Sequence, residues 1–126
     1  MTEKNQIYRC NVCGNIISVF HTGSKSLVCC GQPMELLEAQ KDETLQEKHL
    51  PVVEKTDAVI KVKVGSITHP MEEDHFIEWI QIIAGNKMNL VYLKPGINPE
   101  AEFAILDEEL IVRSYCNKHG LWETTV

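Results

Sequence analysis

Four cysteines near the amino terminus have the spacing of a metal site. Cys10 and Cys13 form a C-x-x-C pair, whose two thiolates can reach one ion across a tight turn. After fifteen intervening residues, Cys29 and Cys30 follow Cys13 as an adjacent pair. Four thiolates suit zinc or iron, and the spacing alone does not distinguish these metals. Because adjacent ligands cannot both relax to ideal geometry, we expect a distorted tetrahedron.

Disulfide bonding is the competing use of these cysteines, and the sequence argues against it. The chain has five cysteines, so a disulfide framework would leave one thiol over. Cys29 and Cys30 are too close to bridge each other without strain. The amino terminus is polar and lacks the apolar core of a signal peptide, so we expect a cytoplasmic protein. In that reducing compartment a cysteine cluster more often binds metal than forms disulfides.

The fifth cysteine and four of the five histidines suggest a second metal site. Two of these histidines lie six residues apart in one polar loop, another opens the strand-like region, and the last belongs to a C-x-x-H pair. The candidate ligands are His49, His69, His75, Cys116 and His119. Such residues at strand ends could converge on a metal, whereas scattered histidines are the alternative that the sequence leaves open. His21 has no such neighbours, and we interpret it as a surface or core residue.

The composition restricts the class of protein. The chain has 126 residues, of which 44% are hydrophobic and 24% charged, as is typical of a folded globular protein. Its formal net charge of -6 argues against a nucleic-acid binder, which usually carries a basic excess. No apolar run approaches the roughly 20 residues that a membrane-spanning helix needs.

The chain is predicted to contain two domains. Residues 1–37 hold the cysteine cluster but few apolar residues, so this domain needs a metal as its core. Residues 38–47 are mostly polar and show no apolar period, which indicates a linker. Residues 48–126 are strand-like, with regular alternation at 60–64, further apolar segments at 77–83, 88–93, 102–106 and 110–115, and turn signals between them. This pattern predicts an antiparallel β-sandwich.

Taken together, the motifs resemble the desulfoferrodoxin family of two-iron superoxide reductases. The resemblance runs essentially from end to end and fills every ligand position of the family's pattern. It rests on the two cysteine pairs, on Glu47-Lys48-His49, on His69-Pro70-Met71-Glu72-Glu73 through His75, and on Tyr115-Cys116-Asn117-x-His119. It implies a mainly β protein, with a small desulforedoxin-like domain followed by an immunoglobulin-like sandwich. It also implies two iron ions, one on Cys10, Cys13, Cys29 and Cys30 and one on His49, His69, His75, His119 and Cys116.

The resemblance further implies an activity. Members of the family reduce superoxide to hydrogen peroxide at the second iron, where the histidines lie in a plane and Cys116 is the axial ligand. They are homodimers and receive electrons from a rubredoxin-type donor. By resemblance, Glu47 occupies the sixth position of the oxidised iron and Lys48 attracts the anionic substrate. From the sequence alone, these two residues would be exposed charges beside the linker.

Two other functions remain open on the residues themselves. One is a small electron carrier, in which the four-cysteine centre is the functional site. The other is a zinc-ribbon module fused to a sandwich that binds a partner. Both leave Cys116 and the four histidines without a joint purpose. Trp79 and Trp122 are interpreted as packing residues.

Overall fold

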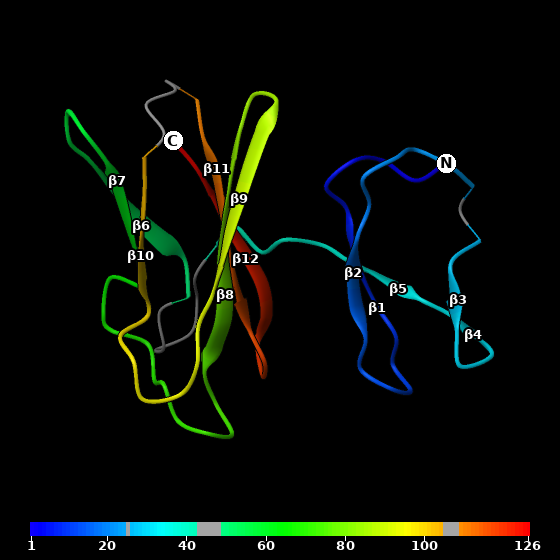
Figure 1. Cartoon of the computed structure of the whole chain (residues 1–126). Coiled ribbons are helices and arrows are strands. Elements are labelled where there is room, and N and C mark those ends of the chain that lie inside the picture. The colour runs from blue at the N-terminus through cyan, green and yellow to red at the C-terminus, as the bar shows by residue number, and fades with distance from the viewer. Residues whose placement is uncertain (25, 43–48, 105–108) are drawn as a thin grey trace. The chain divides into compact units, whose positions relative to one another are not determined.

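The computed structural model describes residues 1–24, 26–42, 49–104 and 109–126, which form two compact units (Figure 1). The first unit is Met1–Glu38 and the second is Ala39–Val126. The described residues form strands and turns and contain no helix, so no helix among them could cross a membrane. The described part of the chain is therefore all-β, which confirms the prediction of a mainly β protein.

The first unit is built around a small antiparallel sheet. Its central strand β1 (Ile7–Arg9) pairs with β2 (Ile16–Ser18) on one side and with β5 (Glu35–Leu37) on the other. The two shortest strands, β3 (Val28–Cys29) and β4 (Gln32–Pro33), form a separate hairpin. The buried apolar side chains of this unit are few: Ile7, Tyr8, Cys10 and Val19. So small a core supports the expectation that a metal stabilises this unit.

The second unit is a sandwich of two antiparallel sheets (Figure 1). One sheet has three strands and the other four, as in constant-type immunoglobulin domains. The first sheet has the order β10 (Glu100–Phe103), β7 (Ile60–Val64), β6 (Pro51–Lys55). The second has the order β12 (Gly120–Thr125), β11 (Ile111–Cys116), β8 (Ile77–Ala84), β9 (Lys87–Tyr92).

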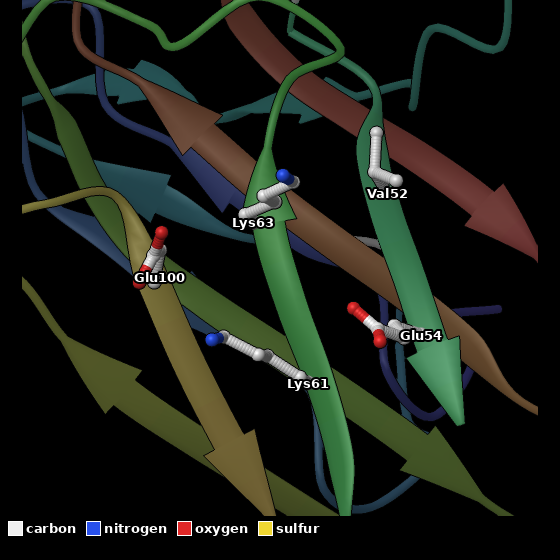
Figure 2. A pocket seen from close by; sticks show the side chains of 5 residues that line it. All are labelled: Val52, Glu54, Lys61, Lys63 and Glu100. Atoms are coloured by element: carbon white, nitrogen blue, oxygen red, sulfur yellow. The ribbon is translucent and has the colours of Figure 1, made fainter. Parts of the chain in front are cut away.

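Strand β7 shows why the sequence alternates. Ile60, Val62 and Val64 are buried and face the sandwich core. Lys61 and Lys63 point away from it and line a shallow pocket on the outer face, as Figure 2 shows. In the strand register Lys61 lies opposite Glu54 of β6 and Lys63 lies opposite Glu100 of β10, so opposite charges alternate across this face. These residues form a solvated sheet face.

The last strand and the boundaries of β10 differ from the prediction. The sequence prediction placed a strand at residues 102–106, whereas β10 spans Glu100–Phe103 and residues 105–108 lie outside the described part. Strand β12 was not predicted. It forms because Gly120 adopts a positive φ of 86°, which lets the chain reverse directly after β11.

Part of the predicted linker, residues 38–47, is attached to the second unit. The Gln40 backbone N–H donates to the Leu121 carbonyl, and the Glu123 N–H donates to the Gln40 carbonyl. Lys41 pairs with Glu123 at 3.5 Å. Residues 43–47 of the predicted linker, and Lys48 after it, lie outside the described residues.

Candidate metal centres

The four cysteines of the first unit form one compact group. Cys10 and Cys13 lie in the turn that follows β1, whereas Cys29 ends β3 and Cys30 begins the turn to β4. All four sulfur atoms lie within 4.8 Å of one another. All five cysteines of the chain are within the described ranges, and none is in a disulfide.

The backbone of both turns is adapted to this convergence. Gly14, directly after the C-x-x-C pair, has a φ of 84°, a region that glycine enters without steric cost. Cys30 has a φ of 54°, which is uncommon for a residue with a side chain, and Gly31 after it has a φ of 75°. These left-handed residues turn the chain so that two adjacent side chains point at one place.

The sulfur separations fit a four-thiolate metal. Cys13 Sγ lies 3.6 Å from Cys29 Sγ, and Cys29 Sγ lies 4.0 Å from Cys30 Sγ. Thiolates about 2.3 Å from a central ion in a tetrahedron are about 3.8 Å apart. The unequal separations are consistent with the distortion expected for an adjacent pair of ligands.

The pKa values of these thiols are also consistent with a site for a bound metal cation. The backbone N–H groups of Cys13 and Val12 stabilise the Cys10 thiolate and lower the pKa of Cys10 to about 6. The neighbouring thiols of Cys13 and Cys29 raise the pKa of Cys30 to about 12. Contact with Cys10 and Cys13 likewise raises the pKa of Cys29. Without a metal the group cannot ionise fully, whereas a bound cation stabilises all four thiolates.

The second group gathers at one end of the sandwich. It contains the five residues predicted from the sequence, and their ligand atoms all lie within 4.8 Å of one another: His49, His69, His75, Cys116 and His119. They come from the segment before β6, the loop between β7 and β8, the end of β11 and the turn to β12. The structure thus brings together residues separated by up to 70 positions.

The ring nitrogens identify which atoms face the centre of this group. His49 Nε2 lies 3.1 Å from His119 Nδ1, and Cys116 Sγ lies 3.7 Å from the same Nδ1. His69 Nδ1 lies 2.7 Å from the Pro70 carbonyl, to which its N–H donates, so Nε2 is the nitrogen left for a metal. A thiolate and several imidazoles are ligands suited to iron, copper or zinc. The donor set therefore fits the second iron that the family resemblance implies.

Hydrogen bonds from outside the group hold two of the ligands in place. The Ser114 hydroxyl donates to the His49 carbonyl at 2.9 Å within the buried core. The Gln40 side-chain amide donates to the His119 carbonyl at 2.7 Å. Such outer contacts fix ligand orientation and are often as important as the ligands themselves. Neither contact can be predicted from local sequence, because each joins residues far apart in the chain.

The burial of the ligands is uneven. Cys116, His49 and His69 are buried, whereas His75 and His119 are half-buried. The side chains of His75 and His119 are thus the ligands of this group that are partly open to solvent. Glu47 and Lys48, which the sequence also predicts at this site, lie outside the described residues.

Two family models together match nearly the whole chain. The model described as "Desulfoferrodoxin, N-terminal domain" matches residues 2–37, and the model described as "Desulfoferrodoxin" matches residues 41–125. A desulfoferrodoxin homolog from Methanothermobacter thermautotrophicus is 57% identical, covering 97% of this chain and 99% of its own. Desulfoferrodoxin from Nitratidesulfovibrio vulgaris is 49% identical, and the alignment covers 98% of each chain.

Solved structures show the same similarity at the level of the fold. The superoxide reductase from Treponema pallidum has a TM-score of 0.78 at 25% identity, covering 94% of this chain and 96% of its own. A superoxide reductase from Giardia intestinalis, described as 1Fe-SOR, has a TM-score of 0.58 at 29% identity. It covers 64% of this chain and 98% of its own.

Proposed function

The chain belongs to the desulfoferrodoxin family, and from this premise we propose that it is a superoxide reductase that converts superoxide to hydrogen peroxide. The observation that carries the proposal is the convergence of four histidines and Cys116 at one end of the sandwich. The residues present fit two non-haem irons, one of which this group would hold and the other the four-cysteine group. When bound to the histidines and Cys116, ferrous iron supplies one electron and a position at which superoxide can bind.

The protein contributes an environment for this electron transfer. The Cys116 thiolate is buried and donates electron density to its side of the centre, as cysteine ligation does in haem enzymes. Neutral imidazoles supply the remaining ligands without adding negative charge that would repel an anion. Reduction of superoxide to hydrogen peroxide consumes one electron and two protons. Water can deliver the protons on the half-exposed side, where His75 and His119 lie.

Glu47 and Lys48 complete the proposal. They directly precede the ligand His49 in the sequence, which supports assigning them to the second centre. Glu47 is proposed to coordinate the oxidised metal in the sixth position, since a carboxylate prefers a hard ferric ion. Lys48 is proposed to attract superoxide by its positive charge.

Two observations support placing the reaction at the second centre. The four-cysteine group has a full set of thiolate ligands, which leaves no place for a substrate. The 1Fe-SOR structure matches 64% of this chain, and Met1–Glu38 is too short to account for that share. The match must therefore rest mainly on the sandwich, where the histidines and Cys116 lie.

The first unit is proposed to exchange electrons with a donor. Cys13 and Cys30 are exposed, so another redox protein can come close to this centre. By resemblance the donor is rubredoxin-type, the chain is a cytoplasmic homodimer, and the reaction removes toxic superoxide. We assign residues 1–37 to the desulforedoxin-like iron domain, 38–47 to the linker and 48–126 to the reductase domain.

The proposal is tested by following each centre while superoxide is supplied. The iron-loaded chain is fully reduced without oxygen and then mixed with buffer that contains dioxygen and formate, in which a radiolysis pulse reduces dioxygen to superoxide. We expect the thiolate-to-metal absorption of the second centre to appear first, with oxidation of the four-cysteine centre lagging behind. Oxidation of the four-cysteine centre alone would support the electron-carrier function instead.

A further inference from the structure

We propose that Asn117 is a positioning residue that holds His75 at a fixed place relative to Cys116 and His119. It lies inside the C-x-x-H pair, between two ligands. The inference rests on the proposed function, because it assigns an outer contact to the second centre. Sequence reasoning gave Asn117 no role of its own.

Asn117 is joined to the His75 loop by three hydrogen bonds. Its side-chain N–H donates to the Asp74 carbonyl at 3.0 Å. Its side-chain oxygen accepts from the Phe76 N–H at 3.0 Å. Its backbone N–H donates to the Phe76 carbonyl at 3.2 Å. The two side-chain bonds therefore reach the residues immediately before and after His75.

This arrangement constrains the ligand more than a single contact could. One planar amide binds a carbonyl on one side of His75 and an N–H on the other, so it restricts both peptide units that carry the ligand. Asparagine suits this place because its short side chain presents a donor and an acceptor together. An aliphatic side chain offers neither group, and a carboxylate offers no donor.

The His75 loop is also anchored at its two ends. Met71 packs against the core and its carbonyl accepts from the Gly96 N–H at 2.9 Å. The Ile77 N–H lies 3.4 Å from Met71 Sδ, and Ile77 is opposite Cys116 in the register of β8 and β11. Nearer the ligand, Glu72 and His75 exchange two backbone hydrogen bonds within the loop itself. That local turn shapes the loop but does not tie it to β11. Asn117 adds a side-chain connection between the residues that flank His75 and the Cys116–His119 turn, beside the pairing of Ile77 with Cys116.

Asn117 is exposed, so removing its amide should change metal binding more than the stability of the fold. Because the side chain is exposed, water can replace its hydrogen bonds, and the fold should lose little stability. The loop would then sample more positions, and His75 would spend less time where it can bind the metal. The cost should therefore appear as weaker metal binding at the second centre, about 10- to 100-fold as for other outer contacts of metal ligands.

The test compares Asn117→Ala with the matched control Asn89→Ala, in which an exposed asparagine of β9 is changed. The metal-free full chain is titrated with ferrous iron, without oxygen and against a competing chelator. We expect Asn117→Ala to weaken iron binding about 10- to 100-fold at the second centre and to leave the four-cysteine centre unchanged. Asn89→Ala should match the wild type at both centres.

Hydrogen exchange of the metal-free chain supplies a readout that a general loss of stability would not produce. The Phe76 amide should lose its protection in Asn117→Ala, while amides in the middle of β8 and β11 keep theirs. If Asn117→Ala does not fold, Asn117→Ser serves in its place, because its hydroxyl can replace at most one of the two side-chain bonds.

Iron affinity equal to the wild type, or unchanged exchange at Phe76, would overturn the role of Asn117. So would loss of protection throughout the sandwich with a parallel loss of iron, because that result indicates a structural role. Failure of the proposed function would look different. In that case the wild type itself would bind no iron at the second centre.

Discussion

The indole of Trp122 lies parallel to the imidazole of His49, with ring centroids 4.7 Å apart and an interplanar angle of 12°. Both side chains are buried, so the indole excludes water from one face of a metal ligand. Trp122 is directly opposite Ser114 in the strand register, and Ser114 holds the His49 backbone. Inner-face residues of β11 and β12 thus fix both the ring and the main chain of His49.

This stacking predicts different results for two substitutions of Trp122. Its indole Nε1 is buried and makes no hydrogen bond within the described part of the chain, so the flat ring is what matters. Trp122→Phe keeps a ring and should retain the absorption of the second iron centre. Trp122→Ala removes the ring and should destabilise the second unit by about 3–5 kcal/mol, with loss of that absorption. Thermal unfolding and the visible spectrum check both outcomes. If Trp122→Phe and Trp122→Ala lose stability and absorption equally, the role belongs to the N–H group and not to the flat ring.

Cys116→Ser should remove the thiolate-to-metal absorption of the second centre and most of the superoxide reductase activity. The reason is that a serine hydroxyl donates far less electron density and binds iron weakly. The four-cysteine centre lies in the other unit and provides an internal control, since its spectrum should not change. If both spectra disappear while the chain stays folded, the two centres are not independent.

Cys13→Ser should abolish the four-cysteine centre and leave the second centre active. Its sulfur lies 3.6 Å from that of Cys29, so its loss breaks the thiolate set. Protein reduced chemically beforehand should still react with superoxide at close to the normal rate. An inactive variant that keeps its second iron would mean that catalysis involves the first centre.

Lys48→Ile should slow the reaction of the ferrous protein with superoxide about tenfold and weaken its dependence on salt. The net charge of -6 repels an anion, but charges more than about 8 Å away are largely screened. A cation near the second centre therefore has the larger effect on the rate at which superoxide arrives. A unit cation at about 6 Å attracts a unit anion by roughly 2.8 kcal/mol at an effective dielectric near 20. Solvent exposure reduces this to about 1.4 kcal/mol, which corresponds to tenfold in rate.

The control for Lys48 is Lys87→Ile, which removes the same charge from an exposed position on β9. Rate constants measured at low and at high salt should resemble the wild type in this control. Equal rates for Lys48→Ile and the wild type at low salt would leave Lys48 as an ordinary surface charge.

The ligands could be predicted from the sequence because their types and spacing carry the chemistry. A C-x-x-C pair and a C-x-x-H pair are local signals, and the alternation of Ile60, Val62 and Val64 marks a half-buried strand. The sandwich and the four-cysteine group therefore follow from short stretches of sequence. Convergence of His49 with the distant Cys116 depended on the family resemblance, because spacing alone cannot bring two distant segments together.

The outer contacts of the second centre could not be predicted in this way. Gln40 lies in a polar stretch that indicates a linker, yet its amide binds the His119 carbonyl, 79 positions along the chain. The interpretation of Trp122 as a packing residue is confirmed, but only the structure shows that its indole packs on the ligand His49. Such contacts depend on how β12 pairs with β11 and with the segment at Gln40. A single sequence carries no local signal for that pairing.

The yield of products tests the central claim most directly. Ferrous protein is mixed with superoxide without a competing dismutase, and both hydrogen peroxide and dioxygen are measured. Reduction at the centre formed by the histidines and Cys116 predicts one hydrogen peroxide for each superoxide consumed, one oxidised second centre for each, and no dioxygen. Half as much peroxide, with an equal amount of dioxygen and no net oxidation of the iron, would show dismutation and contradict the account.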